Sequence, residues 1–236
     1  MIQLNARLDP LSLYYWLLPL LFFAAIAYFT PELDLAISGY FYDSKLGIFP
    51  GGEVYEAIRF WAVIPAMFTA VAATLFLGLS YFIPRWKQWR PYALLLILPM
   101  VLGAGIITHS MLKDHWGRPR PRQIENFGGE NAYRPFYKPN ITWEVQPFKS
   151  FPCGHCTMGF YFFAVALLGR RLGSRPLFAV GMTLAFLLGI ALSVTRIAQG
   201  GHFFSDTIAT ALIMWIIALT CDWLIFKDEW NYARYS

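Results

Sequence analysis

Charged residues are scarce in this chain. Only 14% of its 236 residues are Asp, Glu, Lys or Arg, whereas 57% are hydrophobic. An ordinary soluble domain carries about 25% charged residues, so the composition excludes that class. The sequence also lacks internal repeats and low-complexity tracts, which excludes a repeat array. No segment alternates between apolar and polar residues as the strands of a membrane barrel do. What remains is a helical membrane protein.

Six apolar stretches are long enough, or nearly so, to cross a bilayer. A span needs about 20 mostly apolar residues, and it must be helical because lipid satisfies no backbone hydrogen bonds. The predicted spans cover residues 12–30, 57–83, 91–112, 155–169, 175–195 and 205–226. We therefore predict an all-α, polytopic membrane protein that forms a single domain over residues 1–236.

Basic residues in two short loops predict the topology. Short loops rich in Lys and Arg stay in the cytoplasm. Those between the second and third spans and between the fourth and fifth contain Arg85, Lys87, Arg90, Arg170, Arg171 and Arg175. The loops at 31–56, 113–154 and 196–204 are then on the outer side. Cytoplasmic basic residues and a basic pocket account for the net charge of +5, so we expect no nucleic-acid partner.

Three short clusters hold most of the polar groups that chemistry needs. They cover residues 113–121, 152–155 and 195–206, all on the predicted outer side. Together they contribute two histidines, three basic side chains and one carboxylate. This set suits a pocket that moves a phosphoryl group through a histidine.

The first cluster lies where the third span ends. Pro119 and Pro121 fix the backbone and prevent further helix. Lys113 and Arg120 are therefore left at the aqueous end of the span. Taken alone, they would equally suit interfacial cations that reach toward lipid headgroups.

The second cluster, Pro152-Cys153-Gly154-His155, comes directly before an apolar helix. Free amides at a helix start bind phosphate, and Gly154 lets the backbone approach the ligand closely. A histidine in the first turn can donate a proton to a leaving oxygen. A structural turn with an incidental histidine is the alternative.

The third cluster contains Arg196, His202 and Asp206. The aspartate is the fourth residue after the histidine, so one helical turn brings them together. A carboxylate bound to one ring nitrogen would leave the other free to attack phosphorus. An aspartate at a helix start also fits a partner of the helix dipole.

In combination, the three clusters resemble the motifs of the type 2 phosphatidic acid phosphatase superfamily. Its membrane members share Lys-x6-Arg-Pro, Pro-Ser-Gly-His and Ser-Arg-x5-His-x3-Asp. The order and the internal spacing match this sequence. Cys153 and Thr195 stand where the family usually has serine. Threonine keeps the hydroxyl, whereas cysteine loses one good hydrogen bond to a phosphate oxygen.

The resemblance implies a lipid phosphatase that needs no metal or other cofactor and works through a phosphohistidine. The implied catalytic residues are His202 as the nucleophile, Asp206 as its orienting acid and His155 as the proton donor. The implied phosphate ligands are Lys113, Arg120, Arg196, Cys153 and Gly154. Residues 113–154 would form the active-site loop.

The sequence does not identify the lipid substrate. Residues 117–129 look like those of bacterial members, which implies a bacterial inner membrane with the active site facing the periplasm. Lipid A, undecaprenyl diphosphate and phosphatidylglycerol phosphate all remain candidates. A lipid-to-lipid phosphotransferase and a non-catalytic lipid-binding protein are the alternative functions, and the oligomeric state is open.

Cys153 and Cys156 enclose Gly-His, the spacing found in disulfide oxidoreductases. That activity requires a thioredoxin-like βαβ pattern upstream, which this sequence lacks. A disulfide between the two cysteines on an oxidising face remains open.

Overall fold

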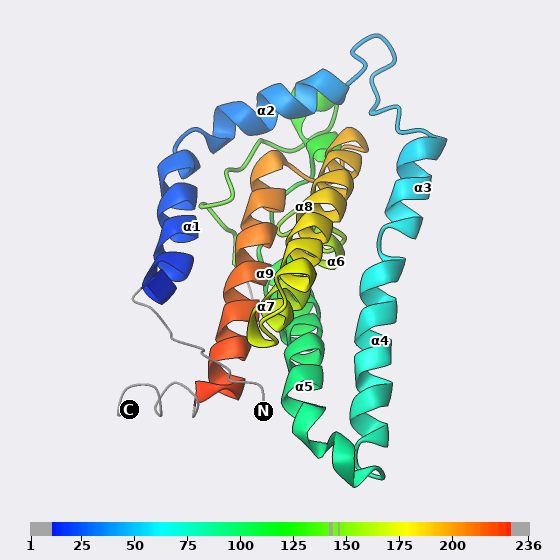
Figure 1. The fold of residues 1–236 in the computed structure, drawn as a ribbon. Helices are drawn as coiled ribbons and strands as arrows, with labels where there is room; N and C mark the ends of the chain where they lie inside the picture. Colours follow the sequence, from blue (N-terminus) through cyan, green and yellow to red (C-terminus); the bar gives the residue numbers. More distant parts are fainter. Residues whose placement is uncertain (1–10, 142–143, 146, 228–236) are drawn as a thin grey trace.

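The computed structural model describes residues 11–141, 144–145 and 147–227, and this part of the chain is helical with no strands beyond isolated bridges (Figure 1). The all-α prediction is confirmed. The main helices are α1 (Leu11–Ala27), α2 (Thr30–Phe41), α3 (Glu53–Trp61), α4 (Ile64–Leu79), α5 (Arg90–Leu98), the π-helix η2 (Pro99–Lys113), α6 (Cys156–Phe160), α7 (Phe163–Arg171), α8 (Arg175–Ala198) and α9 (Phe204–Ile225). Short 3₁₀ turns are η1 (Pro84–Trp89), η3 (Pro121–Gln123) and η4 (Glu125–Phe127).

Four of the predicted spans are long apolar helical segments. They cover Glu53–Leu79, Pro84–Lys113, Arg175–Ala198 and Phe204–Ile225. The first predicted span is instead part of a bent pair, because the chain turns by 77° between α1 and α2. Pro31 lies in the first turn of the second helix of that pair.

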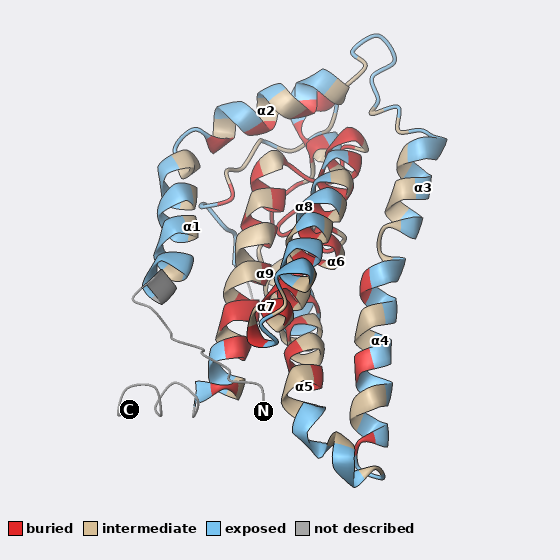
Figure 2. Ribbon diagram, viewed as in Figure 1, coloured by how far each residue is buried: buried red, intermediate tan, exposed pale blue. Residues whose placement is uncertain are grey.

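The predicted span 155–169 is the clearest difference from expectation. Two short helices, α6 and α7, replace it, and neither is long enough to cross a bilayer. Both are largely buried inside the protein (Figure 2). The described residues therefore hold four candidate spans, or five if the bent pair counts as one, rather than the predicted six.

The three polar clusters gather at one end of the bundle, the upper end in Figure 1. There α8 ends, α9 begins and η2 ends, while α2 lies across the top. The basic turns η1 and α7–α8 lie at the opposite end. The structure therefore places the three clusters at the same end of the bundle.

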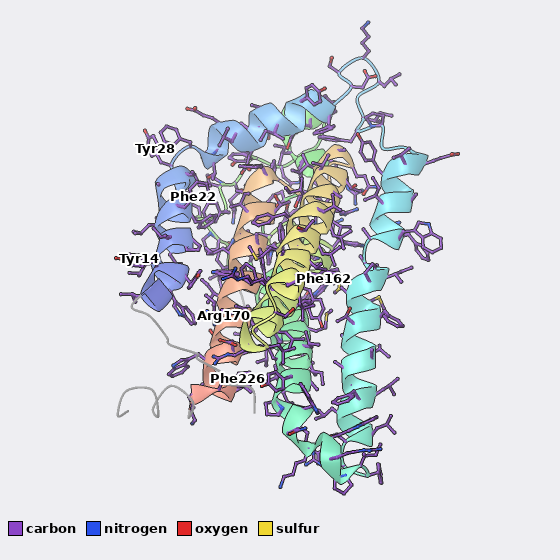
Figure 3. The ribbon with its side chains drawn as sticks, in the orientation of Figure 1. Tyr14, Phe22, Tyr28, Phe162, Arg170 and Phe226 are labelled. Carbon is purple, nitrogen blue, oxygen red and sulfur yellow. A yellow bond between two sulfur atoms is a disulfide. The ribbon has the colours of Figure 1, made fainter. Side chains whose placement is uncertain are left out.

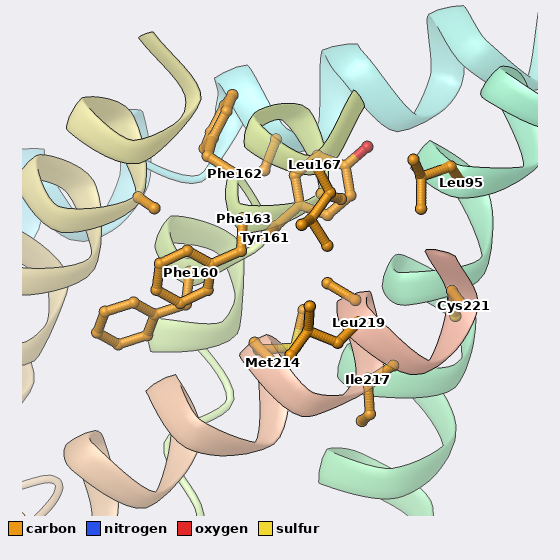
Figure 4. Packing of buried hydrophobic residues seen from close by; sticks show 14 of the residues in the cluster. Leu95, Phe160, Tyr161, Phe162, Phe163, Leu167, Met214, Ile217, Leu219 and Cys221 are labelled. Atoms are coloured by element: carbon orange, nitrogen blue, oxygen red, sulfur yellow. The ribbon is translucent and has the colours of Figure 1, made fainter. Parts of the chain in front are cut away.

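Small residues let α6 and α7 pack closely against α8. A side chain on Gly159 would meet the backbone of Gly189 at 2.4 Å, and one on Gly181 would meet that of Ala166 at 2.3 Å. Close approach through small residues is typical of helix pairs in membranes. Beside this seam, Phe160 to Phe163 and Leu167 pack with residues of α9 (Figure 4).

Large apolar side chains also cover the outside of the bundle. Tyr14 and Phe22 of α1 and Tyr28 of the turn after it are exposed by 54%, 63% and 81% (Figure 3). Such a surface fits lipid better than water.

A buried ion-pair cluster closes the end of the bundle opposite to the polar clusters. Asp222 of α9 accepts hydrogen bonds from Arg171 Nε at 2.6 Å and from Arg170 Nη2 at 2.7 Å. Arg171 and Asp222 are buried, so their charges depend on each other for compensation.

Candidate active site

His202 is held in one tautomer by a backbone carbonyl. It lies in the turn between α8 and α9 and is only 1% exposed. Its Nδ1 lies 2.5 Å from the carbonyl oxygen of Ser150. A carbonyl only accepts hydrogen bonds, so Nδ1 carries the proton. The neutral ring therefore has its lone pair on Nε2, the nitrogen that a nucleophile needs.

Asp206 lies beside His202, within ion-pair distance of its ring. Its Oδ2 is 3.7 Å from His202 Nδ1, beyond hydrogen-bond length. The same oxygen accepts hydrogen bonds from Ser150 Oγ at 2.6 Å and from the Phe203 amide at 2.8 Å. The two residues are therefore within ion-pair distance without a direct hydrogen bond, and Ser150 connects them through its hydroxyl and its carbonyl.

Arg118 is a site residue that the sequence motifs do not single out. Its side chain is fully buried. It donates hydrogen bonds to Asp206, to Ser205 Oγ at 2.9 Å and to Asp34 Oδ2 at 2.7 Å. Arg118 thus compensates two buried carboxylates and ties α2 to the start of α9. No sequence signal indicates this role, because Asp34 is 84 residues away from Arg118.

Arg196 lies in the last turn of α8, and neighbouring residues orient its guanidinium group. Its Nη1 donates to Gln199 Oε1 at 2.5 Å, and Gln199 Nε2 donates to Glu56 Oε1 of α3 at 2.8 Å. A side chain on Gly201 would meet Arg196 Nη2 at 2.5 Å, so a larger residue there would displace the guanidinium group. Sequence reasoning missed Gln199 and Glu56.

One hydrogen-bond donor of the Arg196 guanidinium group is unpaired among the described residues. Its Nε is buried and has no hydrogen-bond partner among the described residues. Buried polar groups are nearly always paired, so an orphaned guanidinium N–H suits an anionic ligand.

Lys113 and Gly154 meet at the second cluster. A side chain on Gly154 would lie 3.1 Å from Lys113 Nζ and 2.7 Å from His109 Nε2. The turn before α6 therefore packs directly on the end of η2, and a larger residue than glycine would displace the His109 and Lys113 side chains. His109, which donates from Nδ1 to the carbonyl oxygen of Ala104, lines the same place.

His155 precedes α6 and is half-buried. Burial and the nearby charges of Arg196 and Lys113 lower the pKa of His155 to about 4. Burial likewise lowers the pKa of His202 to about 4, against the opposing charge of Asp206. Both histidines are therefore neutral at neutral pH in the unliganded site.

The predicted cations and histidines lie close enough together to act on one another electrostatically. Lys113 and Arg196 act electrostatically on both histidines, and Arg120 acts on both of these cations. Burial, together with Arg122, lowers the pKa of Arg120 from its usual value.

Cys153 does not fit its predicted role as a phosphate ligand. It forms a disulfide with Cys156, so it has no thiol to offer. Its backbone amide donates to Thr210 Oγ1 at 2.9 Å, which leaves no donor for a phosphate oxygen. Cys153 is therefore not a candidate phosphate ligand, whereas Gly154 remains one.

We expect anion binding to depend on pH through His155. A bound dianion would raise the lowered pKa of His155, so binding takes up a proton and strengthens as the pH falls. Sulfate keeps its charge over this range. Its dissociation constant should fall about three- to tenfold between about pH 7.5 and about pH 5.5, measured by calorimetry.

The matched control for that titration is His155→Gln. This variant should bind sulfate with little pH dependence, because the titrating ring is gone. An unchanged slope in the variant would assign the proton to another group.

The fold and the site define a class of protein. A membrane-embedded helical bundle that sets an oriented, neutral histidine among permanent cations is typical of integral membrane phosphatases. More particularly, the chain belongs to the PAP2 superfamily, whose family model matches residues 93–230, more than half of the chain. The predicted family is confirmed, and with it the enzyme class, a phosphoric ester hydrolase.

Two known proteins are similar to this chain in sequence. It is 32% identical over 220 residues to the lipid A 4'-phosphatase of Francisella tularensis subsp. novicida (strain U112), covering 91% of this chain and 94% of that protein. It is 27% identical over 109 residues to the lipid A 4'-phosphatase of Rhizobium leguminosarum, covering 46% of this chain and 44% of that protein. No solved structure matches the chain.

Proposed function

We propose that this protein is a metal-independent lipid phosphatase that removes a phosphate from lipid A through a phosphohistidine. The tautomer of His202 carries the proposal, because the Ser150 carbonyl leaves Nε2 unprotonated within a cationic pocket. The substrate is inferred from the two relatives, which are lipid A 4'-phosphatases.

In the first step, His202 Nε2 attacks phosphorus in line and the bond from phosphorus to the lipid oxygen breaks. His155 gives its proton to that leaving oxygen. The substrate dianion raises the pKa of His155, so the proton donor forms when substrate binds. Asp206 steadies the attacking ring through Ser150.

In the second step, water attacks the phosphohistidine and His155 takes the proton of that water. Inorganic phosphate leaves and His202 is regenerated. Negative charge on the phosphoryl oxygens is stabilised in both steps by Lys113, Arg120, Arg196 and the amide of Gly154. These cations supply the charge stabilisation that magnesium supplies in other phosphoryl-transfer enzymes.

We also propose that the site faces the periplasm from the bacterial inner membrane. The basic turns at the opposite end of the bundle support this orientation through the positive-inside rule. The acyl tails of the substrate would stay in the bilayer while the phosphate enters from the membrane surface.

The test is phosphate release by the purified protein in detergent with excess EDTA. Lipid A, undecaprenyl diphosphate and phosphatidylglycerol phosphate are compared, with His202→Ala as the control. We expect release from lipid A that EDTA does not reduce and that the control lacks. Absence of release from all three lipids, or inhibition by EDTA, would contradict the proposal. Transfer of the phosphate to a second lipid would indicate the phosphotransferase instead.

A further inference from the structure

The turn that carries His155 is closed by a covalent bond. Cys153 and Cys156 form a disulfide, with their Cα atoms 5.3 Å apart, and enclose Gly154 and His155. Both cysteines are fully buried. The proposed reaction uses neither sulfur, so the disulfide needs another explanation.

Neighbouring side chains tie this disulfide to the helices that carry the rest of the site. The amide of Cys153 donates to Thr210 Oγ1, and the Thr210 hydroxyl donates to the carbonyl oxygen of Asp206 at 2.7 Å. On α8, Ser193 Oγ lies 3.7 Å from Cys156 Sγ, and its hydroxyl donates to the carbonyl oxygen of Gly189 at 2.7 Å. The turn is therefore held between α8 and α9.

His155 has no orienting partner of its own. In the part of the chain that the structure describes, its side chain makes no hydrogen bond or ion pair. His202 differs, because Ser150 holds its ring. The direction of the His155 ring therefore depends on the backbone of the turn.

We propose that the Cys153–Cys156 disulfide is the positioning element of His155, and that full turnover requires the oxidised form. This inference rests on the proposed role of His155 as proton donor. Reduction by a dithiol would transfer two electrons and two protons. The S–S bond breaks, two cysteine thiols form, and the dithiol becomes a disulfide.

Opening the turn should lower kcat more than it weakens phosphate binding. A displacement of about 1 Å at a reacting group costs about 100-fold in rate, so we expect kcat to fall by about 10- to 100-fold. Lys113, Arg120 and Arg196 lie on other segments. Gly154, whose amide is the one proposed phosphate ligand inside the turn, is the exception. The dissociation constant for sulfate at alkaline pH should therefore rise by about threefold at most.

The experiment compares Cys153→Ala, Cys156→Ala and the double variant with the wild type. Each single variant should lose as much kcat as the double variant, because losing either sulfur removes the same bond. The sulfate titration of the double variant should also lose part of its pH dependence. Cys221→Ala is the control, since Cys221 is a buried free thiol of α9 outside the disulfide.

Reduction of the folded wild type with dithiothreitol is the second measurement. Thiol counting in denaturing detergent should give one thiol before reduction and three after it. The reduced protein should match the alanine variants in kcat. If the variants do not fold, the reduction experiment tests the proposal. If the reductant does not reach the buried sulfurs, the variants test it.

Wild-type kcat and pH dependence in the folded double variant or in the reduced protein would overturn the proposal. Additive effects of the two single substitutions would also overturn it, because they would indicate separate roles for the two cysteines. Failure of the proposed function is distinguishable. Oxidised wild type would then release no phosphate from any lipid, while the sulfate titration would still report on His155.

Discussion

Replacing Arg118 with methionine is expected to lower the free energy of unfolding by about 3–5 kcal/mol and to abolish phosphate release. The substitution leaves the carboxylates of Asp34 and Asp206 buried without their shared cation. It also removes a link between α2 and the residue that steadies Ser150 and His202. Titration with SDS in mixed micelles measures the stability, and phosphate release measures the activity.

Arg171→Met is the matched control for this prediction. Arg171 is also a buried arginine paired with an aspartate, but it lies at the opposite end of the bundle. We expect a smaller loss of stability, because Arg170 still binds Asp222, and normal kcat in the folded fraction. Adding Asp34→Asn to Arg118→Met should recover part of the stability by removing one uncompensated charge. Normal kcat in folded Arg118→Met protein would show that Arg118 does not act on the site.

Replacing His202 with asparagine should reduce kcat by about four to six orders of magnitude, the range found when an attacking nucleophile is removed. Asparagine can still donate to the Ser150 carbonyl, so the fold should be retained. The reason for the loss is specific, because the amide has no nitrogen lone pair to attack phosphorus. Phosphate release and thermal stability in detergent separate the two effects.

His155→Ala should trap the intermediate that His202 forms. An aryl phosphate has a good leaving group and needs little help from an acid, so the first step should proceed. Hydrolysis of the phosphohistidine needs a base and should become slow. Radiolabelled phosphate should then stay on the protein in an acid-labile form, and the label should be absent from His155→Ala/His202→Asn. A label that persists in this double variant would place the phosphoryl group on another residue.

The sequence predicted long helices better than short ones. Four predicted spans coincide with long apolar helical segments, because apolar runs of sufficient length are recognisable locally. Residues 155–169 are equally apolar, but they form α6 and α7, which pack inside the bundle. Composition alone does not distinguish a segment that faces lipid from one that faces other helices. The bend before α2 was missed for a related reason, since α2 is held across the bundle by Asp34 and Arg118.

By itself, the sequence determined the family, the helical membrane architecture and the motif residues that meet in the site, such as Lys113, Arg196 and His202. Residue chemistry, hydropathy and spacing within a turn are local properties. Only the tertiary structure decided that Ser150 stands between His202 and Asp206, and that Cys153 serves a disulfide. Packing brings hydrogen-bond partners together across long sequence separations, here 52 residues from Ser150 to His202, and no local pattern records that proximity.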